Sequence, residues 1–104
     1  MAIKLTEQNY DKLTSSNKLL VIDFGADWCG PCKALEPIIE ELATEFSEMV
    51  NISKCNVDEN SSLSAKYAIR NIPTVLFIKN NEIVDRNVGL ISKVDLKKKI
   101  ENYL

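Results

Sequence analysis

The stretch KLLVIDFGADWCGPCKALEPIIEEL, residues 18–42, joins an apolar run to an amphipathic run through a loop that contains two cysteines. Residues 18–26 are almost continuously apolar, which is typical of a strand buried on both faces of a sheet. Beyond the cysteines, apolar side chains recur at helical spacing, at Leu35, Ile38, Ile39, Leu42 and Phe46. Pro37 lies inside this periodicity, so we expect the helix to be kinked there rather than broken.

The rest of the chain alternates strand and helix signals in the same way. We expect a short strand and helix before residue 18, a second strand at residues 50–57, and a short helix at 60–69 capped by Asn60 or Ser61. A final helix begins after Ser92, with an apolar face formed by Leu96, Ile100, Tyr103 and Leu104.

Residues 74–78 and 82–88 are two strand-like runs separated by Lys79, Asn80 and Asn81. Asparagine tolerates the left-handed backbone of tight hairpin turns, so we expect these two runs to pair antiparallel. Alternating strands and helices that end in a hairpin predict an α/β fold, with a central mixed sheet of about five strands flanked on both faces by about four helices. We expect residues 1–104 to form a single domain, because this length suits one hydrophobic core.

The charge balance and the apolar runs limit the classes of partner. The 13 basic and 15 acidic side chains nearly cancel, so no nucleic-acid partner is expected. The opening MAIKLTEQNY lacks the features of a secretory signal, and no apolar run approaches the roughly 18 residues of a membrane span. We therefore expect a soluble, cytoplasmic monomer that does not bind membranes.

Three cysteines and no histidine narrow the possible chemistry. In the cytoplasm close cysteine pairs are catalytic, redox-sensing or metal-binding, because stable structural disulfides do not persist there. The absence of histidine removes the commonest general base, the Cys-His and Ser-His-Asp nucleophile systems, and the common Cys/His zinc sites. The pair at residues 29 and 32 is then a redox couple, half of a zinc clamp, or two buried cysteines that are close by chance.

Cys29 and Cys32 have the spacing of a disulfide at the first turn of a helix. The unpaired amides and the positive dipole end at a helix N-terminus favour the thiolate of Cys29, which is the reactive form. Gly30 is expected to allow a tight backbone turn, and Pro31 is tolerated because a first-turn amide has no acceptor within the helix. A buried Cys32 would be the resolving thiol.

Asp23 is the second chemical signal, because it lies within the apolar run before the cysteines. A carboxylate buried there costs several kcal/mol unless it is paired, protonated or functional, and burial raises its pKa. The other interpretation is an aspartate at a strand end that points into water. Its position beside the cysteine loop, at the carboxyl end of a strand, favours the functional interpretation.

The segment DFGADWCGPCK, residues 23–33, resembles the active-site segment of the thioredoxin family, whose signature is WCGPC. The resemblance continues in the family's order, with Pro37 in the long helix, KCNVDEN at 54–60, IRNIPTVLFIKN at 69–80 and VGLISK at 88–93. It covers essentially the whole chain. It implies a thioredoxin-like fold and a protein-disulfide reductase that cycles between a dithiol and a Cys29-Cys32 disulfide.

The resemblance also implies roles for individual residues. Cys29 corresponds to the nucleophile, Cys32 to the resolving cysteine, and Asp23 to the buried proton acceptor that activates Cys32. Lys54 corresponds to the lysine that approaches this aspartate, and Pro73 to a proline with a cis peptide bond that faces the cysteines. A flat apolar surface for substrate chains corresponds to Trp28, Gly30, Pro31, Ile72, Val88 and Gly89.

The same resemblance implies that the chain binds no cofactor or metal. Electrons would come from NADPH through a flavin-containing thioredoxin reductase, which would be one partner, and disulfide-containing target proteins would be the others. Cys55 has no counterpart in the active-site motif; we interpret it as inert core, with regulatory oxidation as the alternative. The chain departs from the common family pattern at Gly25, Asn71, Asn81 and Leu90.

Two function classes other than a reductase remain possible at this stage. A zinc site would need four ligands, and the chain offers only Cys55 beyond the close pair. A binding module would use the same apolar surface without using the thiols. Within the redox class, the Gly-Pro pair between the cysteines favours a reductase over an oxidase or isomerase.

Overall fold

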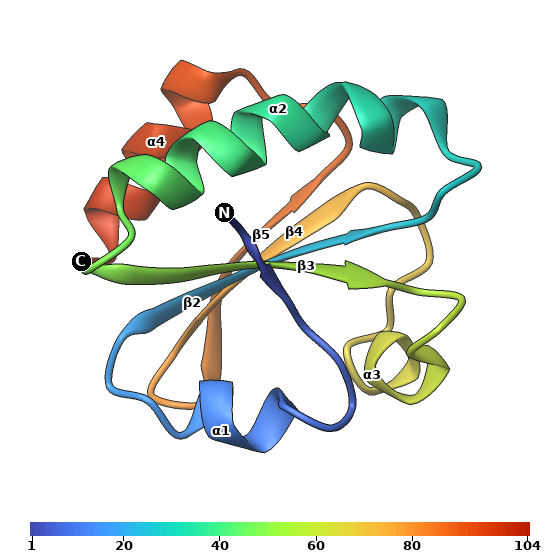
Figure 1. Ribbon diagram of the computed structural model, residues 1–104, viewed down its shortest axis with the longest axis horizontal. Helices are drawn as coiled ribbons and strands as arrows, with labels where there is room; N and C mark the ends of the chain where they lie inside the picture. The colour runs from blue at the N-terminus through green and yellow to red at the C-terminus, as the bar shows by residue number, and fades with distance from the viewer.

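The computed structural model describes residues 1–104 and contains five strands and four helices (Figure 1). In chain order the elements are β1 (Ile3–Lys4), α1 (Tyr10–Thr14), β2 (Leu19–Gly25), α2 (Gly30–Glu45), β3 (Val50–Asn56), α3 (Ser61–Lys66), β4 (Thr74–Lys79), β5 (Glu82–Val88) and α4 (Lys93–Asn102). The sheet order is β1-β3-β2-β4-β5, with β1, β3 and β2 parallel and β4 antiparallel to both β2 and β5. The predicted α/β fold with a mixed five-stranded sheet is confirmed.

The helices cover both faces of this sheet. In Figure 1, α2 and α4 lie above the sheet, and α1 and α3 lie below it. Two separate hydrophobic clusters fill the space between the layers, one on each face. None of the four helices combines the length and the apolar composition that crossing a membrane requires.

β2 is the middle strand of the sheet and supplies side chains to both clusters. Leu19 and Val21 pack in the cluster under α2 and α4, whereas Leu20, Ile22 and Phe24 pack in the cluster over α1 and α3. Successive side chains on a strand point to opposite faces, so a strand buried on both faces carries an unbroken apolar run. This explains the sequence of residues 18–26.

The same alternation places the two charged side chains of the site. Leu19, Val21 and Asp23 are two residues apart along β2, so they point to the same face of the sheet. The carboxyl of Asp23 therefore lies on the face covered by α2. Lys54 on β3 is the register partner of Asp23, and it follows Val50 on the same face. The parallel pairing of β2 with β3 therefore brings Asp23 and Lys54 to neighbouring positions beneath one helix.

The predicted long helix is observed as α2, which runs through Pro37 without ending there. The kink at Pro37 stays a prediction. The predicted hairpin between β4 and β5 is confirmed, and both residues of its turn, Asn80 (φ 52°) and Asn81 (φ 64°), have the left-handed backbone that asparagine tolerates. Ser92 caps α4, because its Oγ accepts a hydrogen bond from the Asp95 amide at 3.1 Å.

Two details of the sequence prediction are wrong. Asn60 occupies the N-cap position of α3, but its side chain does not cap the helix. Its Oδ1 accepts a hydrogen bond from the Glu7 amide, and its Nδ2 donates one to the carbonyl of Asn56, so it ties two loops together. Leu104 is 49% exposed, because α4 ends at Asn102 and the helical repeat no longer directs its side chain to the core.

The core under α2 makes a testable contribution to stability. Leu42 is completely buried there, whereas Leu90 is 60% exposed. We expect Leu42→Ala to lower the free energy of unfolding by about 2 to 5 kcal/mol, since it removes apolar burial and leaves a cavity. The matched variant Leu90→Ala should change it by less than about 0.5 kcal/mol. Urea unfolding measures both values, and equal losses would contradict this packing.

Candidate redox-active site

The two close cysteines lie at the start of α2, immediately after the loop that leaves β2. Cys29 is the N-cap residue with extended backbone (φ −92°, ψ 111°), and its Sγ accepts a hydrogen bond from the Cys32 amide at 3.2 Å. The Cα atoms of Cys29 and Cys32 are 5.2 Å apart, and their sulfur atoms form a disulfide. Pro31 removes no helical hydrogen bond, because amides in the first turn have no acceptor within the helix.

The role expected for Gly30 is wrong. Its backbone does not adopt the left-handed conformation, and a Cβ built at this position would meet no atom within 4 Å outside its own turn of the chain. The chain turns into the helix through the extended backbone of Cys29, so the local geometry does not require glycine after it.

Gly25 is the glycine that the packing does require. A Cβ at Gly25 would lie 3.2 Å from both Cβ and Sγ of Cys32, which is closer than ordinary side-chain contact. The absence of a side chain therefore lets the carboxyl end of β2 lie directly against the disulfide. This departure from the family pattern is a packing feature of the site.

The disulfide faces the loop that precedes β4. Cys29 is 6% exposed and Cys32 is 4% exposed, and both pack in a small cluster with Ala26 and Ile72. The Cys29 Sγ contacts the carbonyl oxygen of Ile72 at 3.9 Å. The Ile72-Pro73 peptide bond is cis, as the resemblance implies.

The residues of the predicted apolar surface are brought together around this loop. The amide of Gly89 donates a hydrogen bond to the Pro73 carbonyl at 2.8 Å, which holds the end of β5 beside the cis peptide. Trp28 is 71% exposed and Val88 is 55% exposed. The Trp28 indole donates a hydrogen bond to Asp58 at 2.9 Å, so one edge of its ring is held in place. Gly30, Pro31 and Leu90 are also exposed, and Ile72 and Gly89 are half-buried.

Asp23 lies behind the disulfide and is only 5% exposed, so the interpretation that it points into water is wrong. Its Oδ1 is buried and has no hydrogen-bond partner. Burial raises the pKa of Asp23 to about 7; the negative charge of Glu36 adds to this rise, and the positive charge of Lys54 opposes it. A carboxyl group with a pKa near neutrality can both accept and release a proton at physiological pH.

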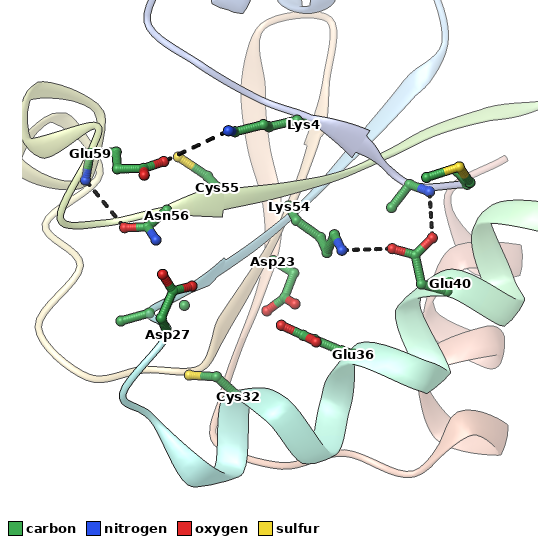
Figure 2. A pocket seen from close by; sticks show the side chains of 14 residues that line it. Lys4, Asp23, Asp27, Cys32, Glu36, Glu40, Lys54, Cys55, Asn56 and Glu59 are labelled. Carbon is green, nitrogen blue, oxygen red and sulfur yellow. Dashed lines mark hydrogen bonds and ion pairs between the residues drawn. The ribbon is translucent and has the colours of Figure 1, made fainter.

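Lys54 lies beside Asp23 in the sheet, but its ammonium group pairs with another carboxylate. Its Nζ lies 2.7 Å from Oε2 of Glu40, and Oε1 of Glu40 accepts a hydrogen bond from the Ala2 amide at 2.8 Å. The hydrogen bond to Glu40 is the main cause that raises the pKa of Lys54 and lowers the pKa of Glu40. The resemblance implies that Lys54 approaches Asp23; here it lines the same cavity while bound to Glu40 (Figure 2).

A cavity of about 380 Å³ opens beside these groups. Its lining includes Asp23, Gly25, Cys32, Glu36, Glu40 and Lys54. The sequence interpretation did not include Glu36 or Glu40. The spacing of the sequence could have identified them, because Cys32, Glu36 and Glu40 are successively four residues apart. Residues with this spacing share one face of a helix.

Cys55 belongs to the other core and is 2% exposed. Burial raises the pKa of its thiol to about 11, and the charge of Glu7 adds to the effect. A thiol that stays protonated is a poor nucleophile, which agrees with an inert core residue. No group of three or more Cys, Asp or Glu side chains in the chain is arranged to hold a metal ion.

The raised pKa of Asp23 predicts how stability depends on pH. The folded chain keeps this proton up to about pH 7, whereas the group has an ordinary pKa of 3.8, so ionisation of Asp23 lowers stability increasingly between these two values. We expect Asp23→Asn to raise the free energy of unfolding at pH 8 by roughly 4 kcal/mol, and to have little effect below pH about 4.

Urea unfolding of wild type, Asp23→Asn and the exposed control Asp27→Asn at several pH values measures this dependence. The control should follow the wild-type curve. Parallel curves for wild type and Asp23→Asn across the same pH range would show that burial does not perturb Asp23.

Comparison with known proteins agrees with the geometry of the site. Residues 1–102 match the family model described as Thioredoxin. The chain is 41% identical over 103 residues to "Thioredoxin" of Buchnera aphidicola subsp. Acyrthosiphon pisum, covering 98% of this chain and 95% of that protein. It is 43% identical over 100 residues to "Thioredoxin 2" of Chlorobaculum tepidum, covering 95% and 92% of the two chains.

A plant relative is similar over a smaller part of its own length. The chain is 42% identical over 101 residues to "Thioredoxin M-type, chloroplastic" of Pisum sativum, which covers 96% of this chain and 59% of the plant protein. The family match spans nearly every residue and includes the strand, the cysteine loop and the helix that build the site. The chain has the thioredoxin-like fold and belongs to the thioredoxin family, whose members are disulfide oxidoreductases.

Proposed function

We propose that this chain, as one domain, reduces disulfides in target proteins, with Cys29 as the nucleophile and Cys32 as the resolving thiol. The family makes it a dithiol-disulfide oxidoreductase; the direction of the reaction and the role of each residue are our proposal. The observation that carries it is the Cys29-Cys32 disulfide at the N-terminus of α2, with the buried and unpaired carboxyl of Asp23 behind it.

The first step uses the position of Cys29 at the helix N-terminus. Unpaired amides and the helix dipole stabilise its thiolate, and the Cys32 amide already donates a hydrogen bond to its Sγ. The thiolate attacks one sulfur of a target disulfide. A bond forms between Cys29 and that sulfur, and the other target sulfur leaves as a thiolate.

The second step uses Asp23. Cys32 loses its proton to the Asp23 carboxylate and attacks the Cys29 sulfur. The bond between Cys29 and the target breaks, the target leaves as a second thiolate, and the Cys29-Cys32 disulfide forms. The target has gained two electrons, and the chain has lost two.

The proposed docking surface is the exposed apolar area around Cys29. Trp28 and Val88 are exposed there, and the Ile72 carbonyl contacts the sulfur that reacts first. Exposed apolar side chains beside a reactive atom suit an unfolded segment of a target chain. Gly30, Pro31 and Gly89 complete this proposed surface, together with Pro73, which is buried in the chain by itself.

The other parts of the proposal concern the cycle and its location. Electrons would come from NADPH through a flavin-containing thioredoxin reductase, with no cofactor bound to this chain, which would act as a monomer. The unpaired thiol of Cys55 suits a reducing compartment, and we propose the cytoplasm.

Single cysteine variants test the two steps separately. Cys29→Ser should reduce a disulfide-containing test protein no faster than the background reaction, because no other thiol is placed to attack. Cys32→Ser should accumulate a mixed disulfide, since the second step is lost. The rate of test-protein reduction and mass spectrometry of trapped species measure these outcomes.

Cys55→Ser is the matched control and should reduce the test protein at the wild-type rate. Activity that survives in Cys29→Ser would refute the proposed nucleophile. A partner-dependent process that persists when both Cys29 and Cys32 are serine would favour a binding module instead.

The direction of the reaction can be tested by equilibration with glutathione. We expect the Cys29-Cys32 couple to be more reducing than glutathione, so that oxidised glutathione converts most of the dithiol to the disulfide. Thiol alkylation after equilibration measures the two forms. A couple that takes electrons from reduced glutathione would identify an oxidant rather than a reductase.

A further inference from the structure

The face of α2 that lines the cavity carries a second carboxylate directed at Asp23. Cys32, Glu36 and Glu40 occupy successive turns on this face, and all three line the cavity. Figure 2 shows the carboxyl groups of Glu36 and Asp23 pointing toward one another, while the Glu40 carboxylate binds Lys54. Glu36 itself is exposed and forms no ion pair with any residue of the chain.

The charges around Asp23 come from the elements packed against β2. β4 contributes an uncharged neighbour, because Val75 is the register partner of Asp23 on that side. β3 contributes Lys54, whose ammonium lies 2.7 Å from Glu40. α2 contributes Glu36 and Glu40. The remaining charged side chains of the cavity are Asp27, Lys4 and Glu59, and the charged groups of Lys4 and Glu59 lie 3.9 Å apart.

Of the two other cavity carboxylates without an ion pair, Glu36 and Asp27, only Glu36 points toward Asp23 in Figure 2. The positive charge of Lys54 is largely balanced by Glu40, so it opposes protonation of Asp23 less than a free ammonium would. The negative charge of Glu36 has no such partner. Two nearby carboxylates repel when both are ionised, and this repulsion increases the affinity of the more buried one for a proton. The negative charge of Glu36 accordingly raises the pKa of Asp23.

We propose that Glu36 is a positioning residue for the resolving step, and that its carboxylate makes Asp23 a stronger proton acceptor for Cys32 while Glu40 holds Lys54 away. The inference rests on the proposed function, because it acts on the step in which Cys32 attacks Cys29. Glu36 touches no reacting atom; it acts through Asp23. The proton moves from the Cys32 thiol to the Asp23 carboxylate, and the electron pair of the Cys32 sulfur forms the bond to Cys29.

Two measurements on Glu36→Gln test this inference. The first is the titration midpoint of the Asp23 carboxyl, followed by carbon NMR in the reduced protein. The second is the pH profile of the resolving rate, measured as release of an aromatic thiol from a mixed disulfide preformed on Cys29. We expect both midpoints to fall by about half a pH unit, the size expected for loss of one nearby, partly solvated charge. The rate above pH 8 should fall by about two-fold, because a weaker base accepts the proton.

Matched variants separate this effect from a structural one. Glu41→Gln changes the same charge on the same helix, where Glu41 lies 3.8 Å from Lys93 and outside the cavity, and it should leave both midpoints unchanged. Glu36→Asp keeps the negative charge, so both midpoints should stay close to their wild-type values. Glu40→Gln releases Lys54 toward Asp23 and should also lower both midpoints.

The outcomes distinguish the inference from the proposed function. Unchanged midpoints in Glu36→Gln, or midpoints that stay unchanged or rise in Glu40→Gln, would overturn the inference. A shift of the Asp23 titration with no shift of the rate profile would also overturn it. The proposed role of Asp23 fails separately, if Asp23→Asn resolves the mixed disulfide at the wild-type rate above pH 8.

Discussion

The burial of β2 on both faces is the constraint on which the site depends. Each side chain of this strand points to one of the two faces of the sheet, and the apolar ones enter the core on that face. A shift of one residue would exchange the two sets of side chains and turn Asp23 away from α2. The apolar run therefore holds the carboxyl in one position, although the carboxyl itself is unfavourable in that environment.

The site forms where one face of the sheet meets one face of α2. The two-residue repeat of β2 and β3 brings Asp23 and Lys54 to the same face of the sheet. The helical repeat of α2 directs Cys32, Glu36 and Glu40 toward that face, and the helix begins at the N-cap residue Cys29. Gly25 allows the strand to reach the disulfide, because no Cβ separates it from Cys32.

The electrostatics of the site oppose stability and serve the proposed chemistry. Burial without a hydrogen-bond partner favours the neutral form of Asp23, so the folded chain is less stable when this group is ionised. The same environment brings the pKa of the Asp23 carboxyl close to neutral pH, where a general base is most effective. The pairing of Lys54 with Glu40 preserves this property, since a direct pair with Asp23 would hold the carboxyl in its charged form.

The sequence by itself predicted the order of strands and helices, the mixed sheet and a cysteine pair spaced for a disulfide at the helix start, and it favoured a buried Asp23 over one that points into water. These features follow from local patterns: apolar periodicity, turn residues and the three-residue cysteine spacing. Only the tertiary structure decided that Lys54 binds Glu40, that Glu36 faces Asp23, and that Gly25 rather than Gly30 is required by packing. The physical reason is that the partner of a charged or small side chain depends on which faces of elements far apart in the sequence come together. A local sequence pattern contains no information about that contact.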